Sequence, residues 1–236
     1  MRTEECVIQV GAERLAATKI YADSGQPPSV ISFHGTGITG TRARIRYLLE
    51  GLADHGVSSA CFDFSGHGES TGKLEQASLS LRKEEGYEAA KLLGRQGSLA
   101  IIGTSMGGYT AALMAPLLEP RSLILFCPAA YPEEAMELKF DDGFTAVARR
   151  PGAYVNSPAF RALSTFKGNL LIVAARKDTV IPKEVIDLYA ESAPLAKSRK
   201  LIWLEECDHK VNVWLSEHEE ERANILREVL AVTREE

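Results

Sequence analysis

A serine, an aspartate and a histidine each follow an apolar segment of this sequence, and together they could catalyse acyl transfer. Ser105 stands at the centre of a G-x-S-x-G pattern that spans residues 103–107. Flanking glycines are typical of a sharp turn from a buried strand into a helix, which holds the hydroxyl in a strained, exposed position. The N–H groups at the start of that helix can stabilise negative charge. The pattern predicts a nucleophile at Ser105, provided that the chain supplies a base and an acid.

The base and the acid are predicted from the order of residues along the chain. In Ser-His-Asp enzymes whose nucleophile lies in a G-x-S-x-G turn between a strand and a helix, the order is serine, acid, histidine. Asp178 follows the apolar segment 170–175, and His209 follows the next apolar segment, 201–204. A histidine in this role removes the serine proton, and the acid fixes the imidazole tautomer and stabilises its cation. The sequence therefore predicts Asp178 as the acid and His209 as the base.

Other histidines and acids fit these roles less well. His218 is expected on the solvated face of the last helix, and the remaining three histidines precede the serine, which breaks the order: His34, His55 and His67. Asp208 adjoins His209, but neighbouring side chains on an extended chain point apart. A helix cap before Pro182 is the alternative interpretation of Asp178.

Two backbone N–H groups are needed to bind the oxyanion that forms during acyl transfer. The residue after the nucleophile, Met106, is expected to provide one of them. The loop after the apolar segment 30–33 reads His-Gly-Thr-Gly, and its glycines leave the Thr36 N–H free to face the site. Thr36 is therefore the candidate for the second donor, although a plain turn also accounts for this loop. Gly35 and Tyr131 are further predicted to contact the substrate.

A second glycine-rich loop, Asp-Phe-Ser-Gly-His-Gly-Glu-Ser at residues 63–70, precedes the nucleophile. We expect Asp63 and His67 to hold this loop by hydrogen bonds rather than to take part in catalysis. Neither loop matches the phosphate-binding patterns of nucleotide-binding proteins, and no H-E-x-x-H or comparable ligand cluster is present. The sequence therefore gives no support for nucleotide binding, and we expect no metal.

Composition narrows the class of protein. Hydrophobic residues make up 45% of the 236 residues, which is enough for a sizeable core, and the net charge of −5 disfavours nucleic acid as the partner. No apolar stretch approaches the ~20 residues that span a bilayer, and the first residues lack an apolar signal region. The four cysteines are far apart with no C-x-x-C spacing, which predicts free thiols in a reducing cytoplasm. The expected partner is a small-molecule ester, and the oligomeric state stays open.

Strand and helix patterns alternate along the chain, which predicts a mostly parallel sheet covered by helices. Strands are expected near residues 5–10, 14–21, 30–33, 58–64, 98–102, 123–127, 169–175 and 199–205, and helices near 42–55, 75–94, 106–118 and 182–193, with one more at the end of the chain. Residues 128–166 hold four of the ten prolines and no clean strand. We expect a single domain over residues 1–236 with a small cap inserted at 128–166.

With these motifs in view, the sequence resembles the α/β-hydrolase superfamily from Val30 through His209. The forms D-x-x-G-x-G-x-S and G-x-S-M-G-G are similar to those of the branch that holds monoacylglycerol-lipase-like and cinnamoyl- or feruloyl-esterase-like enzymes. The resemblance implies an α/β-hydrolase fold with a mainly parallel sheet of about eight strands. It also implies a triad of Ser105, His209 and Asp178, an oxyanion hole of Thr36 and Met106, and no cofactor.

The function expected from these residues is hydrolysis of carboxylic esters with small-to-medium acyl groups through an acyl-enzyme. A cap as short as residues 128–166 favours small substrates over those of true lipases. Hydrolysis of a thioester or an amide by the same triad stays open, because fold and triad do not fix the leaving group. A non-catalytic member of the fold that only binds a ligand also stays open, and nothing in the sequence distinguishes a carbon–carbon or cyanohydrin lyase.

Overall fold

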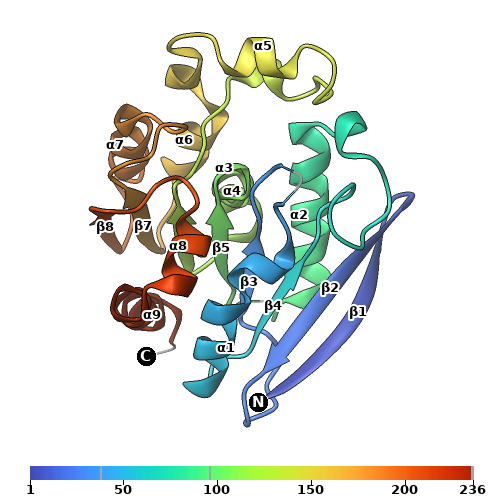
Figure 1. The fold of residues 1–236 in the computed structure, drawn as a ribbon, viewed down its shortest axis with the longest axis vertical. Helices are drawn as coiled ribbons and strands as arrows, with labels where there is room; N and C mark the ends of the chain where they lie inside the picture. Colours follow the sequence, from blue (N-terminus) through green and yellow to red (C-terminus); the bar gives the residue numbers. More distant parts are fainter. Residues whose placement is uncertain (38, 96, 235–236) are drawn as a thin grey trace.

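The centre of the computed structural model, which describes residues 1–37, 39–95 and 97–234, is an open sheet (Figure 1). Within these residues, eight strands pair in the order β1-β2-β4-β3-β5-β6-β7-β8. Their bounds are β1 Arg2–Val10, β2 Glu13–Tyr21, β3 Val30–Phe33, β4 Ser59–Phe62, β5 Ala100–Thr104, β6 Ser122–Phe126, β7 Asn169–Ala175 and β8 Ser198–Leu204. The pairs β1–β2 and β2–β4 are antiparallel, and the other pairs are parallel. The predicted mainly parallel sheet of eight strands is confirmed.

Helices cover both faces of this sheet, which is why its central strands are apolar on both sides. They are, with the short 3-10 turns marked η, η1 Arg42–Ile45, α1 Arg46–Asp54, η2 Leu74–Gln76, α2 Leu79–Leu93, α3 Met106–Leu113, α4 Ala115–Leu118, η3 Glu133–Ala135, α5 Phe144–Ala148, η4 Ala153–Asn156, α6 Pro158–Leu163, α7 Lys183–Glu191, α8 Val211–Glu217 and α9 Glu219–Thr233. Neighbouring residues of one strand serve different layers. Ile101 of β5 packs in the layer with α2, α3, α6 and α7, whereas Ile102 packs in the layer with α1, α8 and α9.

The helix expected at residues 75–94 begins later than predicted. Residues 74–76 form the turn η2, and α2 starts after Ser78, whose backbone is extended and whose Oγ accepts a hydrogen bond from the Leu81 N–H at 3.2 Å. A serine at this position stabilises a helix start, because it satisfies one of the N–H groups that the first turn leaves without a partner. The helix 106–118 is likewise divided into α3 and α4 at Met114.

Residues 128–166 contain the short elements η3, α5, η4 and α6 and, within the described chain, no strand. In Figure 1 the yellow segment with α5 lies above the upper end of the sheet. The last element of the segment, α6, instead packs against α3, with Ala159 and Leu163 fully buried. A separate cap over this range stays a prediction.

Parallel strands carry the candidate residues to one edge of the sheet. The loops after β3, β5, β6, β7 and β8 all leave from the carboxyl ends of neighbouring parallel strands. Ligands of open α/β sheets bind at this edge.

None of the helices formed by the described residues is long and apolar enough to cross a membrane. All four cysteines are free, as the sequence predicts.

Candidate active site

The turn at Ser105 holds an unusual backbone conformation. Ser105 lies between β5 and α3 with φ 53° and ψ −117°, a positive φ that a residue with a side chain rarely adopts. Its N–H donates to the Phe126 carbonyl oxygen at 2.9 Å, and its carbonyl oxygen accepts from the Ala129 N–H at 3.0 Å. Strain of this kind costs about 1–3 kcal/mol and persists only where surrounding contacts fix the backbone. Here β6 and the loop after it fix the backbone of Ser105.

The flanking glycines are required by close packing. A Cβ at Gly103 would lie 2.4 Å from the Gly107 carbonyl oxygen, and a Cβ at Gly107 would lie 2.3 Å from the carbonyl oxygen of Phe33. Neither position can hold a side chain without displacing backbone. The G-x-S-x-G pattern therefore allows α3 to start directly against β3 and β5, with the half-buried Ser105 side chain at the sheet edge.

The structure brings Ser105, His209 and Asp178 together in one hydrogen-bonded chain. His209 Nε2 lies 3.0 Å from Ser105 Oγ, and His209 Nδ1 lies 2.7 Å from Asp178 Oδ2. With the proton on Nδ1, the ring donates to the carboxylate and its Nε2 accepts from the serine hydroxyl. The side chain of Asp178 is 5% exposed and that of His209 is 22% exposed, so the imidazole is the member open to the site.

Hydrogen bonds keep Asp178 ionised. Its other oxygen, Oδ1, accepts from the N–H groups of Val180 at 2.7 Å and Ile181 at 2.9 Å. Burial opposes ionisation, but the hydrogen bonds from His209 and from these N–H groups outweigh it and hold the pKa of Asp178 below its ordinary value. The ionised carboxylate can orient the ring and stabilise its cation.

The other candidates for acid and base lie elsewhere. Asp208 is exposed, and its Oδ1 accepts from the Lys210 N–H at 2.8 Å, so it does not compete for the imidazole. The sequence predicts His218 within the last helix, and this prediction is wrong. His218 lies between α8 and α9, where its ring stacks on Trp214 with centroids 3.9 Å apart. The alternative interpretation of Asp178 is a cap of the following helix. That helix, α7, begins at Lys183 with Pro182 at its cap position, so Asp178 is not its cap.

The loop after β3 lies directly against the serine. A Cβ at Gly35 would lie 3.2 Å from both Ser105 Cβ and the Thr104 carbonyl oxygen. Thr36 and Met106 line the same small recess beside Gly35. Among residues 1–37, 39–95 and 97–234, neither the Thr36 N–H nor the Met106 N–H donates to an acceptor. Both N–H groups are thus without an acceptor among these residues, and their role as oxyanion donors stays a prediction.

His34 holds this loop from behind. Its Nε2 accepts from the Phe64 N–H at 3.0 Å, so the proton is on Nδ1, which donates to the Gly35 carbonyl oxygen at 2.6 Å. Burial, followed by repulsion from the neighbouring His67, lowers the pKa of His34 from 6.5 to about 3. The two rings lie 4.8 Å apart, centroid to centroid. His34 is therefore a neutral link between the two glycine-rich loops rather than a second base.

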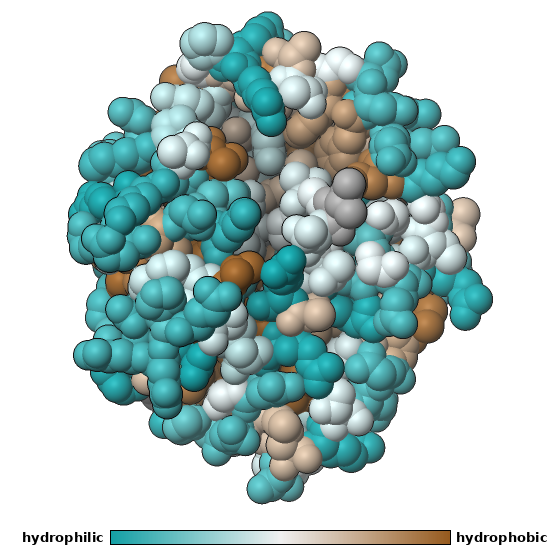
Figure 2. Space-filling view, in the orientation of Figure 1, coloured by the Kyte–Doolittle hydropathy of each residue, from teal (hydrophilic) through white to brown (hydrophobic). Residues whose placement is uncertain are grey.

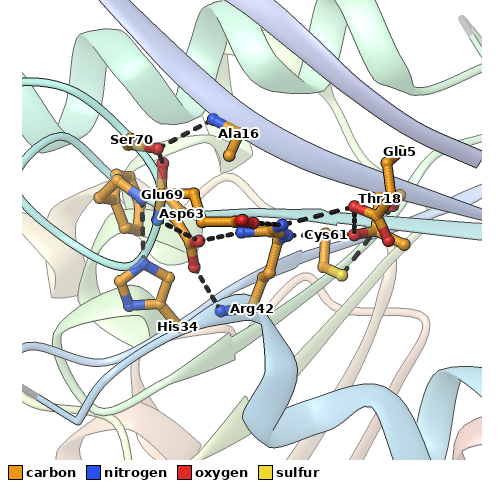
Figure 3. Close-up of polar contacts among 10 residues, drawn as sticks. Glu5, Ala16, Thr18, His34, Arg42, Cys61, Asp63, Glu69 and Ser70 are labelled. Carbon is orange, nitrogen blue, oxygen red and sulfur yellow. Dashed lines mark hydrogen bonds and ion pairs between the residues drawn. The ribbon is translucent and has the colours of Figure 1, made fainter.

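Asp63 holds the second glycine-rich loop, as the sequence predicts. Figure 3 shows its carboxylate facing Arg42 and the backbone of the loop. Asp63 Oδ1 accepts from the Arg42 N–H at 2.6 Å, Oδ2 accepts from the Glu69 N–H at 3.3 Å, and the Arg42 guanidinium pairs with both Asp63 and Glu69. The carboxylate of Asp63 has no contact with the serine and acts as a structural acid.

Sequence reasoning missed a buried ion pair below the same loop. Arg82 Nη1 lies 2.7 Å from Glu85 Oε2, with both side chains at most 1% exposed. Arg82 also donates to Ser65 Oγ at 2.9 Å and to the Ser65 carbonyl oxygen at 2.8 Å. The signal in the sequence is two opposite charges three residues apart on the apolar face of α2. This pair fixes the loop that in turn supports His34.

A cavity of about 320 Å³ opens beside the serine. Ser105 and His209 line it, together with Gly35 and Thr36 from the loop after β3 and residues from η1 and the start of α8. Figure 2 shows a hollow below the α5 segment where less polar side chains gather between polar rims. The structure does not bring Tyr131 into the cavity wall. Its ring packs on Tyr109 and Phe144 instead, with centroids 5.0 and 5.4 Å away.

Within the described residues, one group of side chains offers the donors for a metal ion. Cys127 Sγ, an Asp178 oxygen and a His209 ring nitrogen lie within 4.8 Å of one another. Burial raises the pKa of the Cys127 thiol well above its ordinary value, which disfavours the thiolate that metals bind. His209 Nδ1 and Asp178 already bond to each other. The sequence expectation that no metal is used stays a prediction.

Comparisons with known proteins place this chain in a family. A family model for serine aminopeptidase, S33, matches residues 27–158, which is more than half of the chain. No curated protein sequence matches the chain at the threshold applied.

Solved structures with the same fold include several hydrolases. The chain is similar to Est1E from Butyrivibrio proteoclasticus, solved with ferulic acid bound, with a TM-score of 0.71 and 20% identity over 97% of this chain and 98% of that one. It is also similar to a thioesterase domain from the curacin biosynthetic pathway, with a TM-score of 0.73 and 14% identity over 98% and 100% of the two chains. A Pyrococcus furiosus esterase, Pf2001, gives a TM-score of 0.66 and 20% identity over 96% and 92%. The chain belongs to the serine aminopeptidase S33 family and is a serine hydrolase of the α/β-hydrolase fold.

Proposed function

We propose that this hydrolase cleaves carboxylic esters of small-to-medium acyl groups with Ser105 as nucleophile, His209 as base and Asp178 as acid. The observation that carries the proposal is the hydrogen-bonded chain of these residues, 3.0 Å and 2.7 Å, at the wall of a cavity of about 320 Å³. Cavities of this volume suit small organic ligands.

The proposed reaction proceeds through an acyl-enzyme. Ser105 Oγ attacks the ester carbonyl carbon while its proton passes to His209 Nε2, and the carbonyl oxygen becomes an oxyanion. The N–H groups of Thr36 and Met106 stabilise that oxyanion, and losing one such donor costs about 3 kcal/mol of barrier. His209 then protonates the leaving alcohol and activates a water molecule that releases the acid.

Two other leaving groups compete with an alcohol in this proposal. The family description names an aminopeptidase, and one fold relative is a thioesterase domain. Initial rates on an oxygen ester, a thioester and an aminoacyl amide with the same acyl group would rank the three reactions. A p-nitrophenyl ester series of increasing acyl length would then define the acyl group. A purely ligand-binding protein would cleave none of these substrates.

A fluorophosphonate probe tests the nucleophile. We expect the probe to label wild-type protein, and we expect Ser105→Ala to lose both labelling and ester hydrolysis. The matched control is Ser164→Ala, an exposed serine at the end of α6 whose hydroxyl bonds only to the Arg161 carbonyl oxygen. Labelling that survives in Ser105→Ala would refute the assignment.

A further inference from the structure

Two cationic side chains line the cavity beside Ser105, and no acidic side chain accompanies them among its described lining residues. Arg44 belongs to η1, and Lys210 directly follows His209 and precedes α8, which contacts η1. Both side chains are exposed to the cavity and solvent. The chain as a whole is acidic, with a net charge of −5, so these two cations do not reflect an overall positive charge.

Within the described chain, the Arg44 guanidinium forms a hydrogen bond through one of its three nitrogens. Its Nε donates to the Thr39 carbonyl oxygen at 3.2 Å. Within residues 1–37, 39–95 and 97–234, its two terminal nitrogens have no acceptor. A planar guanidinium offers a pair of parallel N–H groups that match the two oxygens of a carboxylate.

The Lys210 ammonium group likewise forms no ion pair within the described chain. Its backbone N–H donates to Asp208 Oδ1, but no carboxylate of the described chain lies within 4.0 Å of its ammonium group. The neighbouring cations differ in this respect, because Arg42 pairs with Asp63 and Arg46 pairs with Glu50 at 3.0 Å. Among the described residues that line the cavity, Arg44 and Lys210 thus carry positive charges that can pair with the anion of a ligand.

Hydroxyl groups in the wall of this cavity are further hydrogen-bond donors. The cavity is also lined by Thr36, Thr39 and Thr41, whose hydroxyls can donate to an oxygen anion. Asn212 lies in the same wall, but its amide is occupied by Thr104 Oγ1 at 3.0 Å and by the Tyr47 hydroxyl at 3.1 Å. Thr36, Thr39, Thr41, Arg44 and Lys210 are thus the candidate donors of this lining to an anion.

We propose that the substrate of this site is an ester that carries a carboxylate elsewhere in the molecule, which Arg44 and Lys210 bind while Ser105 attacks the ester carbonyl. The proposal rests on the proposed function, because it names the substrate class of the same site. The carboxylate belongs to either the acyl or the alcohol half of the ester, and two pairs of substrates distinguish these sources.

The first experiment compares charged and neutral substrates of the same size. For the acyl half, the pair is the p-nitrophenyl monoester of adipic acid and the p-nitrophenyl ester in which an amide replaces the free carboxylate. For the alcohol half, the pair is 4-acetoxybenzoate and 4-acetoxybenzamide. We expect wild-type protein to favour the anion of one pair in kcat/KM, after correction for the uncatalysed rates. Raising the salt from 0.1 M to 1 M shortens the screening length from about 10 Å to about 3 Å and should reduce this preference.

The second experiment removes each cation in turn. Arg44→Gln and Lys210→Gln should each lower kcat/KM for the preferred anion about tenfold, the effect of losing one charge-assisted hydrogen bond, and should leave its neutral partner within about twofold. Lys200→Gln is the control for a lost positive charge, since Lys200 on β8 pairs with Glu228 at 2.6 Å and lies outside the cavity lining. This control should keep the wild-type preference.

Failure of this inference is distinguishable from failure of the proposed function. Hydrolysis of neutral esters through Ser105, with no preference for either anion or with a preference that both variants retain, would overturn the carboxylate proposal alone. Equilibrium binding to Ser105→Ala gives a readout that needs no turnover. Tighter binding of an intact anionic ester than of its amide, lost in Ser105→Ala/Arg44→Gln, would support the proposal even if the leaving group were misassigned. Equal binding of both would refute it.

Discussion

Protonation of His34 should destabilise the fold, because the neutral ring is part of the support of the Thr36 loop. The ring is 6% exposed, and its Nε2 accepts from the Phe64 N–H, so a proton on Nε2 would break that hydrogen bond. The informative perturbation is His34→Gln, whose amide oxygen can still accept a hydrogen bond and does not titrate. The variant should lose some stability at neutral pH but should also lose part of the acid sensitivity of the wild type.

The magnitude follows from the pKa of the ring in the two states. Burial, and then His67, lower the pKa from 6.5 to about 3 on folding. Above pH ~6.5 neither state binds this proton, whereas between pH ~6.5 and ~3 the unfolded chain binds it and the folded chain does not. Stability therefore falls as the pH falls, by about 1.4 kcal/mol per pH unit. Between pH 6.5 and pH 5 the contribution of His34 is about 2 kcal/mol.

Urea denaturation at pH 7.5, 6.0 and 5.0 measures this contribution. We expect the free energy of unfolding of the wild type to drop about 2 kcal/mol more than that of His34→Gln between pH 7.5 and pH 5.0. The control is His55→Gln, which replaces an exposed histidine at the end of α1 and leaves the loop contacts intact. Equal pH dependence of the wild type and His34→Gln would show that His34 titrates alike in both states and would refute the reasoning.

Three further substitutions test the support of the site. Gly107→Ala places a methyl group 2.3 Å from a strand carbonyl oxygen, so we expect a loss of several kcal/mol or no folded protein, measured by thermal unfolding. Asp178→Asn should preserve the fold by circular dichroism but lower kcat about 10⁴-fold, because an amide can hold His209 in the wrong tautomer; a loss below tenfold would contradict the assigned acid. Arg82→Met should cost about 3–5 kcal/mol since it leaves Glu85 charged and buried, whereas Arg82→Met/Glu85→Leu should cost less; a double variant as unstable as the single one would contradict this account.

The fold and the central residues were accessible from sequence because their signals are local. Each parallel strand contains a short apolar run, and a chemically distinctive residue follows three of them: Ser105, Asp178 and His209. Parallel strands must end at a common edge, so chain order alone was enough to predict that these residues meet. The glycine pattern around the serine is similarly local, because it is imposed by one turn.

What the sequence concealed depends on contacts between distant segments. The sequence analysis does not single out Arg82 and Glu85, because only the packing of α2 against the loop at Ser65 buries them. Tyr131 was predicted to contact substrate, but aromatic neighbours from α3 and α5 keep its ring out of the cavity wall. Arg44 was not singled out at all, since a cation next to a cavity is recognisable only when the cavity is known.

The proposed triad and the proposed substrate-binding cations lie on different parts of this fold. The strained backbone of Ser105 is tied to β6 by the Phe126 carbonyl oxygen and to β3 through the contact of Gly107, so the buried sheet fixes the position of this proposed nucleophile. Sheet interiors are close-packed, which resists any shift of that position. The cations instead stand on the turn η1 and on the residue after His209, where side chains change without disturbing the sheet. If Arg44 and Lys210 bind the substrate as proposed, substitution at these two positions should alter which substrate is bound while the distance from Ser105 Oγ to the imidazole stays the same.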